Sequence, residues 1–245
     1  MMTDVTTRYI VLVLLVLVSL SSLEPSAIEC SQSETDYPHA YPRDGVIKRF
    51  ENERVIVWEV LWLNGISQPF HRHQYDMTGV FLRWGPLRVT RLDGTFTVSD
   101  SPFEVPSVFL LRKGVTHKEE GLGTPERHSI MIDLKDFHGR TYTPRTDIPV
   151  AFPPDGSTAK LDEDRVRIWD ITLENGQELP LHVHNYDTVA VFLQGGTVRI
   201  QDEDGTESTD TWAYKDVRFW PAGLAHSEVV VDGSPRAMIY ELLNQ

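Results

Sequence analysis

The chain carries one sequence pattern twice, and this internal repeat limits its fold more than any other feature. Ala40-Tyr41-Pro42-Arg43-Asp44-Gly45 returns 111 residues later as Ala151-Phe152-Pro153-Pro154-Asp155-Gly156. The same spacing relates Arg54-Val55 to Arg165-Val166, Trp58 to Trp169, Asn64-Gly65 to Asn175-Gly176, and Asp93-Gly94-Thr95 to Asp204-Gly205-Thr206. Agreement without a gap over this distance indicates a tandem duplication of one small domain.

Each copy has the pattern of a β domain. The segment 55–63 is rich in β-branched and aromatic residues and ends at the turn Asn64-Gly65, while 188–193 and 197–201 are predicted to be two further short strands. Residues 40–245 show no sustained helical periodicity. Short strands between Gly, Pro and Asp turns predict an all-β sandwich or barrel in each copy.

The repeat also sets the expected domain boundaries. We expect a first barrel over residues 40–137, a linker over 138–150 and a second barrel over 151–245. A long loop, Lys118–Arg127, is expected to interrupt the first copy only. Residues 1–39 lie outside the repeat and are predicted to be a signal or anchor segment followed by a polar tether.

The N-terminal segment contains an uncharged apolar run from Tyr9 to Leu20. About 20 apolar residues are needed to cross a bilayer, whereas the apolar region of a secretory signal has roughly 7–15. The run therefore predicts an extracytoplasmic protein, with the signal either cleaved or kept as a membrane anchor through residues 9–23. A buried N-terminal helix or strand is the alternative.

Charge and cysteine content exclude several classes of protein. The chain has 23 basic and 36 acidic residues, a net charge of −13, and such a surface repels nucleic acid. Its single cysteine, Cys30, excludes an internal disulfide framework and a cysteine-rich zinc module.

Six of the nine histidines lie at equivalent positions of the two copies. In the second copy, His182-Val183-His184 follows Pro180, and alternation along a strand places both imidazoles on one face. His226 follows a Pro-x-Gly turn and could supply a third nitrogen. Three histidines with an open coordination position are typical of a catalytic metal site. His71, His73 and His117 form the equivalent set of the first copy.

These residues resemble the two motifs of the cupin superfamily, Gly-x5-His-x-His-x(3,4)-Glu-x6-Gly and Gly-x5-Pro-x-Gly-x2-His-x3-Asn. In the second copy, the first motif is matched by Gly176, His182, His184 and Gly195, and the second motif by Pro221, Gly223 and His226. In the first copy, the first motif is matched by Gly65, His71 and His73, and the second motif by Gly114 and His117. The resemblance covers nearly all of residues 40–245. It implies a bicupin, with two double-stranded β-helix (jelly-roll) barrels and a metal in the barrel mouth.

The chain departs from these motifs where the family has its glutamate ligand. Asp76 and Asp187 come one position early, and strand alternation turns them away from the histidines unless a bulge re-aims them. Asp187 is therefore weighed as a fourth ligand of the second site. A three-histidine site resembles the cupin thiol dioxygenases and diketone-cleaving oxygenases more than the oxalate-degrading enzymes.

The first copy departs from the second motif as well. It has Arg112 where the family has proline, followed by Lys113, and two cations near a metal would oppose its charge. We therefore expect the first site to be the weaker of the two.

Two functions follow from these residues. The first is an enzyme that acts on a small organic molecule with a divalent metal, Fe, Mn or Zn, as an oxygenase or as an isomerase or decarboxylase. The second is a non-catalytic barrel that binds a small ligand or a metal. Sequence alone names no catalytic residue beyond the metal ligands, and edge strands could pair to form homo-oligomers.

Overall fold

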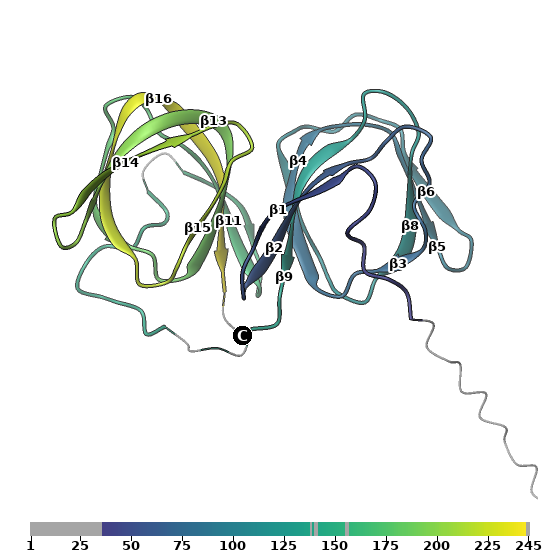
Figure 1. The fold of residues 1–245 in the computed structure, drawn as a ribbon, viewed down its shortest axis with the longest axis horizontal. Coiled ribbons are helices and arrows are strands. Elements are labelled where there is room, and N and C mark those ends of the chain that lie inside the picture. Colours follow the sequence, from purple (N-terminus) through teal and green to yellow (C-terminus); the bar gives the residue numbers. More distant parts are fainter. Residues whose placement is uncertain (1–35, 138, 140–141, 155–156, 244–245) are drawn as a thin grey trace, which may run out of the picture. The chain divides into compact units, whose positions relative to one another are not determined.

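The computed structural model describes residues 36–137, 139, 142–154 and 157–243, and in these residues it contains strands and no helix. The predicted signal or anchor segment, Cys30 and part of the predicted linker lie outside the described residues. No helix in the described part of the chain is long and apolar enough to span a membrane. The prediction of an all-β protein is confirmed, with several antiparallel sheets (Figure 1).

The first barrel is built from nine antiparallel strands in two sheets. One sheet has the order β1 (Val46–Glu51), β2 (Val55–Leu61), β9 (His128–Leu134), β4 (Asp76–Arg83) and β7 (Ser107–Leu111). The other has the order β3 (His71–Arg72), β8 (Thr116–Gly121), β5 (Leu87–Arg91) and β6 (Phe96–Ser99). The expected loop Lys118–Arg127 is shorter than predicted, because residues 118–121 belong to β8.

The second barrel uses fewer, longer strands. Its sheet order is β10 (Thr158–Asp162), β11 (Val166–Thr172), β16 (Ala225–Leu242), β13 (Asp187–Asp202) and β14 (Glu207–Trp212), while β12 (Glu178–Val183) pairs with β16 and β15 (Val217–Trp220) with β13. The two strands predicted at 188–193 and 197–201 are one strand, β13. It continues through register shifts near Gln194 and Gly196, which bend it from one side of the barrel to the other.

Strand alternation buries both faces of the central strands. In β2, Val55 and Val57 face the second barrel, while Ile56, Trp58 and Val60 face the interior of the first. The side chains that face the opposite barrel form a single buried cluster between the barrels: Val55, Val57, Val80, Ile130, Ile132, Leu134, Val166, Ile168, Val189, Val191, Met238, Tyr240 and Leu242. Sheets buried on both faces read as nearly continuous apolar runs, as β2 does.

Each barrel also has an interior of its own. Trp58, Trp62 and Met131 belong to the buried interior of the first barrel. Phe192 and Trp212 stack with ring centroids 4.3 Å apart in the second. The chain thus has three apolar layers, and the layer between the barrels is made by residues of both copies.

We predict that Ile132→Ala, at the centre of this shared layer and 0% exposed, lowers the free energy of unfolding by about 2–5 kcal/mol, since it leaves a cavity. Urea unfolding followed by tryptophan fluorescence should show one transition for both barrels, shifted as a whole. Ile47→Ala on β1, at a side chain 60% exposed, is the control and should change the free energy by less than about 0.5 kcal/mol. Two separate transitions, of which only one moves, would contradict a shared core.

Candidate metal centres

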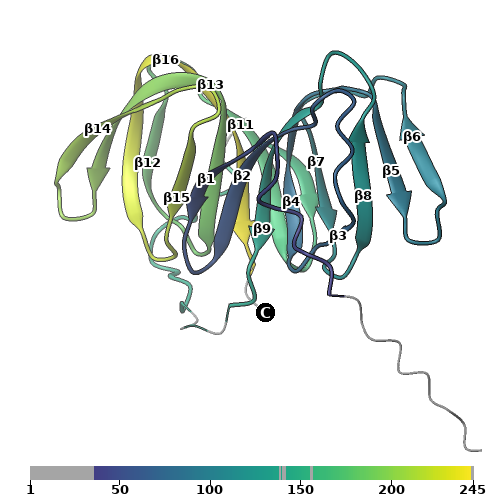
Figure 2. The ribbon, with the colours of Figure 1, turned by 45° about the vertical axis from the view of Figure 1, so that its right-hand side comes forward.

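The second barrel brings His182, His184 and His226 together. His182 on β12 is the direct cross-strand partner of His226 on β16, and the two strands run side by side (Figure 2). His184 follows directly after β12, and its Nε2 lies 3.3 Å from Nε2 of His226. One nitrogen from each of the three residues lies within 4.8 Å of the others.

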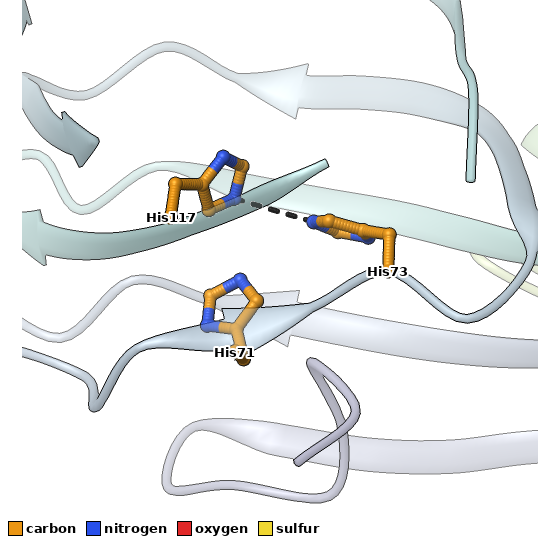
Figure 3. Close-up of side chains that lie close together, drawn as sticks. All are labelled: His71, His73 and His117. Atoms are coloured by element: carbon orange, nitrogen blue, oxygen red, sulfur yellow. Dashed lines mark hydrogen bonds between the residues drawn. The ribbon is translucent and has the colours of Figure 1, made fainter. Parts of the chain in front are cut away.

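The first barrel repeats this arrangement with His71, His73 and His117 (Figure 3). His71 on β3 is the cross-strand partner of His117 on β8. The Nε2 atoms of His73 and His117 are 3.2 Å apart. The predicted equivalence of the two histidine sets therefore extends to their geometry.

One contact per barrel fixes which ring nitrogen faces the cluster. Nδ1 of His182 lies 2.9 Å from the carbonyl oxygen of Pro180, and Nδ1 of His71 lies 3.2 Å from that of Pro69. A carbonyl can only accept a hydrogen bond, so each Nδ1 carries the proton and each Nε2 presents a lone pair to the cluster. Nε2 of His71 is buried without a hydrogen-bond partner.

The spacing of these nitrogens fits a metal ion. Metal–nitrogen bonds of about 2.0–2.1 Å at tetrahedral angles separate two ligand nitrogens by about 3.3 Å. The observed Nε2 separations are 3.2 and 3.3 Å. Three converging neutral imidazoles suit a divalent zinc, manganese or iron ion.

Burial keeps the histidines neutral, as metal ligands must be. Loss of hydration, together with the charge repulsion of neighbouring histidines of the cluster, lowers the pKa of His184 to about 2 and that of His226 to about 4. In the first barrel the same causes lower the pKa of His73 to about 3, and burial lowers that of His71 to about 4. The pKa values of His117 and His182 are also lowered by burial.

These shifts predict that the metal-free protein loses stability in mild acid. Below the ordinary histidine pKa of 6.5 the unfolded chain binds more protons than the folded one, so the free energy of unfolding falls as the pH falls from 6.5 toward 4. Each buried histidine contributes up to about 1.4 kcal/mol per pH unit. Glu228, whose pKa is raised to about 7, and Glu241, whose pKa burial also raises, make the free energy of unfolding change with pH in the opposite direction, but they are two groups against six histidines.

Urea unfolding of metal-free protein at pH 7.5, 6.5 and 5.5 checks this expectation. The double variant His71→Gln, His182→Gln should show a shallower dependence on pH than the natural chain. Equal stability at all three pH values would contradict neutral burial of the two clusters.

Asp187, weighed from the sequence as a fourth ligand, is engaged elsewhere. Its carboxylate lies 2.8 Å from Nε of Arg54, a residue of the first barrel, and accepts the backbone N–H of Ala222 at 2.9 Å. It is not part of the histidine cluster. The alternation of β13 turns it outward, toward the other barrel.

Asp76 of the first barrel makes the equivalent contacts, one to a backbone N–H of its own barrel and one to an arginine of the other barrel. Its carboxylate accepts the backbone N–H of Lys113 at 2.9 Å and lies 3.5 Å from Nε of Arg165, a residue of the second barrel. Arg54 and Arg165 are equivalent in the repeat, as are Asp76 and Asp187. Each aspartate therefore ties the turn that precedes the third histidine of its own barrel to an arginine of the other barrel.

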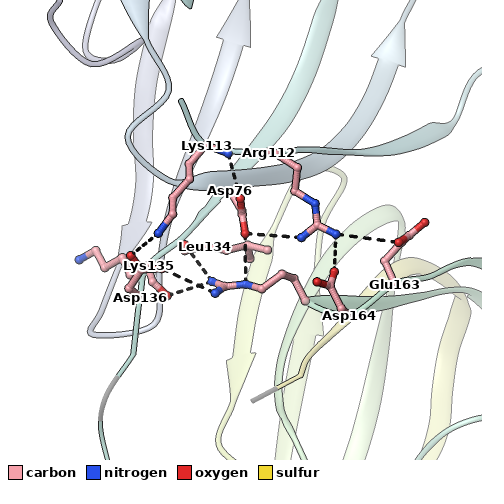
Figure 4. Close-up of polar contacts among 9 residues, drawn as sticks. Asp76, Arg112, Lys113, Leu134, Lys135, Asp136, Glu163 and Asp164 are labelled. Atoms are coloured by element: carbon pink, nitrogen blue, oxygen red, sulfur yellow. Dashed lines mark hydrogen bonds and ion pairs between the residues drawn. The ribbon is translucent and has the colours of Figure 1, made fainter. Parts of the chain in front are cut away.

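Arg112 and Lys113, expected to oppose a metal in the first barrel, point to this contact region instead (Figure 4). Arg112 pairs with Asp164, and it lies 3.7 Å from Asp76. Lys113 Nζ lies 2.7 Å from Asp136. Two other cations lie beside the first histidine cluster: Arg43, whose guanidinium is 2.7 Å from Glu119, and Arg91, the cross-strand partner of His117.

Two buried glutamates close to the clusters were not predicted as site residues. Glu119 Oε1 lies 3.8 Å from Nε2 of His117, and Glu228 Oε1 lies 3.3 Å from Nε2 of His226. Both stand two residues after the third histidine, and this spacing puts them on the same strand face. That spacing was visible in both copies and could have identified them.

The two glutamates have opposite electrostatic surroundings. Burial alone would raise the pKa of Glu119, but the charge of Arg43, the neighbouring histidines and the N–H of Trp62 together lower it to about 2. Burial, together with the charge of Asp210, raises the pKa of Glu228 to about 7. Glu119 is thus a fixed anion, whereas Glu228 can carry a proton near neutral pH.

We predict that Asp187→Asn retains the metal of the second site, because its carboxylate contacts Arg54 and Ala222 rather than the histidines. His184→Ala should lose that metal, and elemental analysis of the two variants compares them directly. If Asp187→Asn lost as much metal as His184→Ala, Asp187 would have to be a metal ligand after all.

No protein-family model matches the chain, and no curated protein matches it in sequence. Similarity to solved structures, in contrast, extends over most of the chain. Oxalate decarboxylase from Bacillus subtilis, in a structure described for its Mn(II) centers, is 12% identical with a TM-score of 0.55 over 84% of this chain and 79% of that one. AerE from Microcystis aeruginosa is 12% identical with a TM-score of 0.56 over 85% of this chain and 99% of that one.

At this identity the similarity concerns the fold alone. Together with the two barrels and a histidine triad in each, it shows that the chain has the cupin fold in two copies. The resemblance seen in the sequence motifs is therefore confirmed for the fold.

Proposed function

We propose that this bicupin is a metal-dependent enzyme whose second barrel holds a divalent ion through His182, His184 and His226. One observation carries the proposal: two residues of this triad, His182 and His184, line a cavity of about 50 Å³ that Glu228 also lines. A metal, a space for a small molecule and a buried carboxyl group therefore lie side by side, as catalysis requires.

The metal would supply Lewis acidity for iron, manganese or zinc alike, and redox chemistry with dioxygen if it is iron. Iron favours an oxygenase, as the three-histidine resemblance implies, while manganese or zinc favours an isomerase or decarboxylase. The structural similarity to a manganese-containing oxalate decarboxylase adds manganese to the metals to be tested first.

The residues of the chain position the ligands and the substrate. The ring of His184 is held between Phe152, with centroids 5.4 Å apart, and Trp220, with centroids 5.3 Å apart. These contacts fix the direction of its nitrogen and exclude water from one side of the site. Glu228, 3.3 Å from His226, is placed to exchange a proton with a molecule in the cavity.

A second candidate function, metal binding without turnover, is favoured for the first barrel. There Arg43 and Trp62 both contact Glu119 beside the triad, and both side chains are buried. This packing fills the interior beside the first triad, as in structural metal sites, while His117 also lines a pocket on the other side that contains Arg72 and Arg91.

We expect elemental analysis of the full-length protein to find metal at both triads. His182→Ala, His184→Ala should remove the metal of the second site and all turnover, whereas His71→Ala, His73→Ala should remove the metal of the first site and keep turnover. Oxygen uptake and carbon dioxide release, measured with iron-, manganese- and zinc-loaded protein and a panel of small chelating molecules, give the activity. Circular dichroism of the variants confirms that they remain folded.

A protein that takes up no metal after anaerobic reconstitution would refute the proposed enzyme. If metal binds normally but the iron-, manganese- and zinc-loaded proteins all show no turnover, metal binding without catalysis would be the function of both barrels.

A further inference from the structure

The cavity of the second barrel has mostly apolar walls. Its lining includes Phe152, Leu173, Leu179, Phe192, Trp212 and Trp220, and the polar groups that reach it are His182, His184 and Glu228. No lysine or arginine lines it among the residues that the structure describes. Its shape and polarity therefore set a limit on what can lie next to the second triad.

The equivalent space of the first barrel is filled by its own side chains. The guanidinium of Arg43 lies 5.4 Å from the ring centroid of Tyr41 and 5.6 Å from that of Trp62. It lies 2.7 Å from the carboxylate of Glu119, which also accepts the N–H of Trp62 at 2.8 Å. These four residues form a closed polar cluster behind the first triad.

Three replacements in the second copy open this cluster. The positions of Tyr41, Arg43 and Trp62 are taken by Phe152, Pro154 and Leu173, while the glutamate is kept as Glu228. The replacements remove a hydroxyl, a cation and an indole from the wall of the cavity. What remains is an apolar space with a carboxyl group and the metal-binding nitrogens at one end.

Because the cavity is polar at one end and apolar elsewhere, it should bind a molecule that is polar at one end more tightly than a molecule that is charged at both ends. Oxalate has a charged group at each end, so one carboxylate could meet a metal at the triad while the other faced aromatic and aliphatic walls. A buried charge without a partner is strongly unfavourable. An apolar group in the same place gains free energy by leaving water.

We infer that the second barrel takes a small, mainly apolar molecule with a single polar, metal-binding end, and that the first barrel takes no such molecule. The inference rests on the proposed function, because a metal at the triad gives the polar end its partner. It names the substrate class that the proposed function leaves open, and Leu173 and Pro154 are its specificity-determining residues.

Isothermal titration of full-length, metal-loaded protein tests this with two probes of similar size. Pentane-2,4-dione has one chelating edge and apolar ends, whereas oxalate is charged at both ends. We expect the dione to bind at least about tenfold more tightly than oxalate. Metal content is measured on the same samples.

Two variants transfer features of the first barrel into the second. Leu173→Trp should fill the cavity and weaken binding of the dione by at least about tenfold while the metal stays bound. Pro154→Arg adds the missing cation and should shift the preference toward oxalate, so it provides a second test if the tryptophan variant does not fold. Trp62→Leu, the matched change in the first barrel, should leave the affinity for the dione unchanged.

The outcomes separate the two proposals. Protein without metal refutes the proposed function and this inference with it. Metal-loaded protein that binds oxalate as tightly as the dione, or whose affinity for the dione is unaffected by both Leu173→Trp and Pro154→Arg, refutes this inference alone.

Discussion

The apolar layer shared by the two barrels is the constraint on which the rest of the structure depends. Strands such as β2 and β16 bury one face in their own barrel and the other against the neighbouring barrel. Neither copy could expose its outer face to water without losing the burial of residues such as Ile132 and Tyr240. The two copies therefore share one buried layer, to which β16, the strand of His226, contributes Met238, Tyr240 and Leu242.

Polar contacts at the edge of this layer connect it to the two histidine clusters. Asp76 and Asp187 each bind a backbone N–H in the turn before the third histidine, and each pairs with an arginine of the opposite barrel. The two contacts are related by the repeat: Arg54 of the first barrel pairs with Asp187 of the second, and the equivalent Arg165 of the second pairs with the equivalent Asp76 of the first. The position of His117 and His226 therefore depends on how the barrels dock as well as on the fold of each barrel.

The two copies retain the same six histidines and the same two glutamates but differ in what surrounds them. In the first copy Arg43 and Trp62 hold Glu119 as a buried anion. In the second, Pro154 and Leu173 leave Glu228 beside an open apolar cavity. Three replacements in one scaffold, at the positions of Tyr41, Arg43 and Trp62, therefore distinguish a glutamate held by an arginine and a tryptophan from a glutamate that lines an apolar cavity.

The sequence by itself determined the duplication, the all-β class and the six histidines, since these follow from spacing and from strand alternation, which are local. It could not show that β13 and β16 run unbroken through the second barrel. A short polar or glycine-containing interruption of an apolar segment is compatible with a bulge inside one strand and with a turn between two strands. It correctly turned Asp187 away from the histidines by strand alternation, but it misplaced the roles of Arg112 and Lys113. Only the tertiary structure, by docking the outer faces of the barrels, showed that Arg54 pairs with Asp187 and Arg112 with Asp164 across the interface. Glu119 and Glu228 could have been identified from their spacing, two residues after the third histidine of each copy. The physical reason is that Asp187 and Arg112 find their charged partners in the other barrel, and spacing along the chain does not record contacts between residues so far apart.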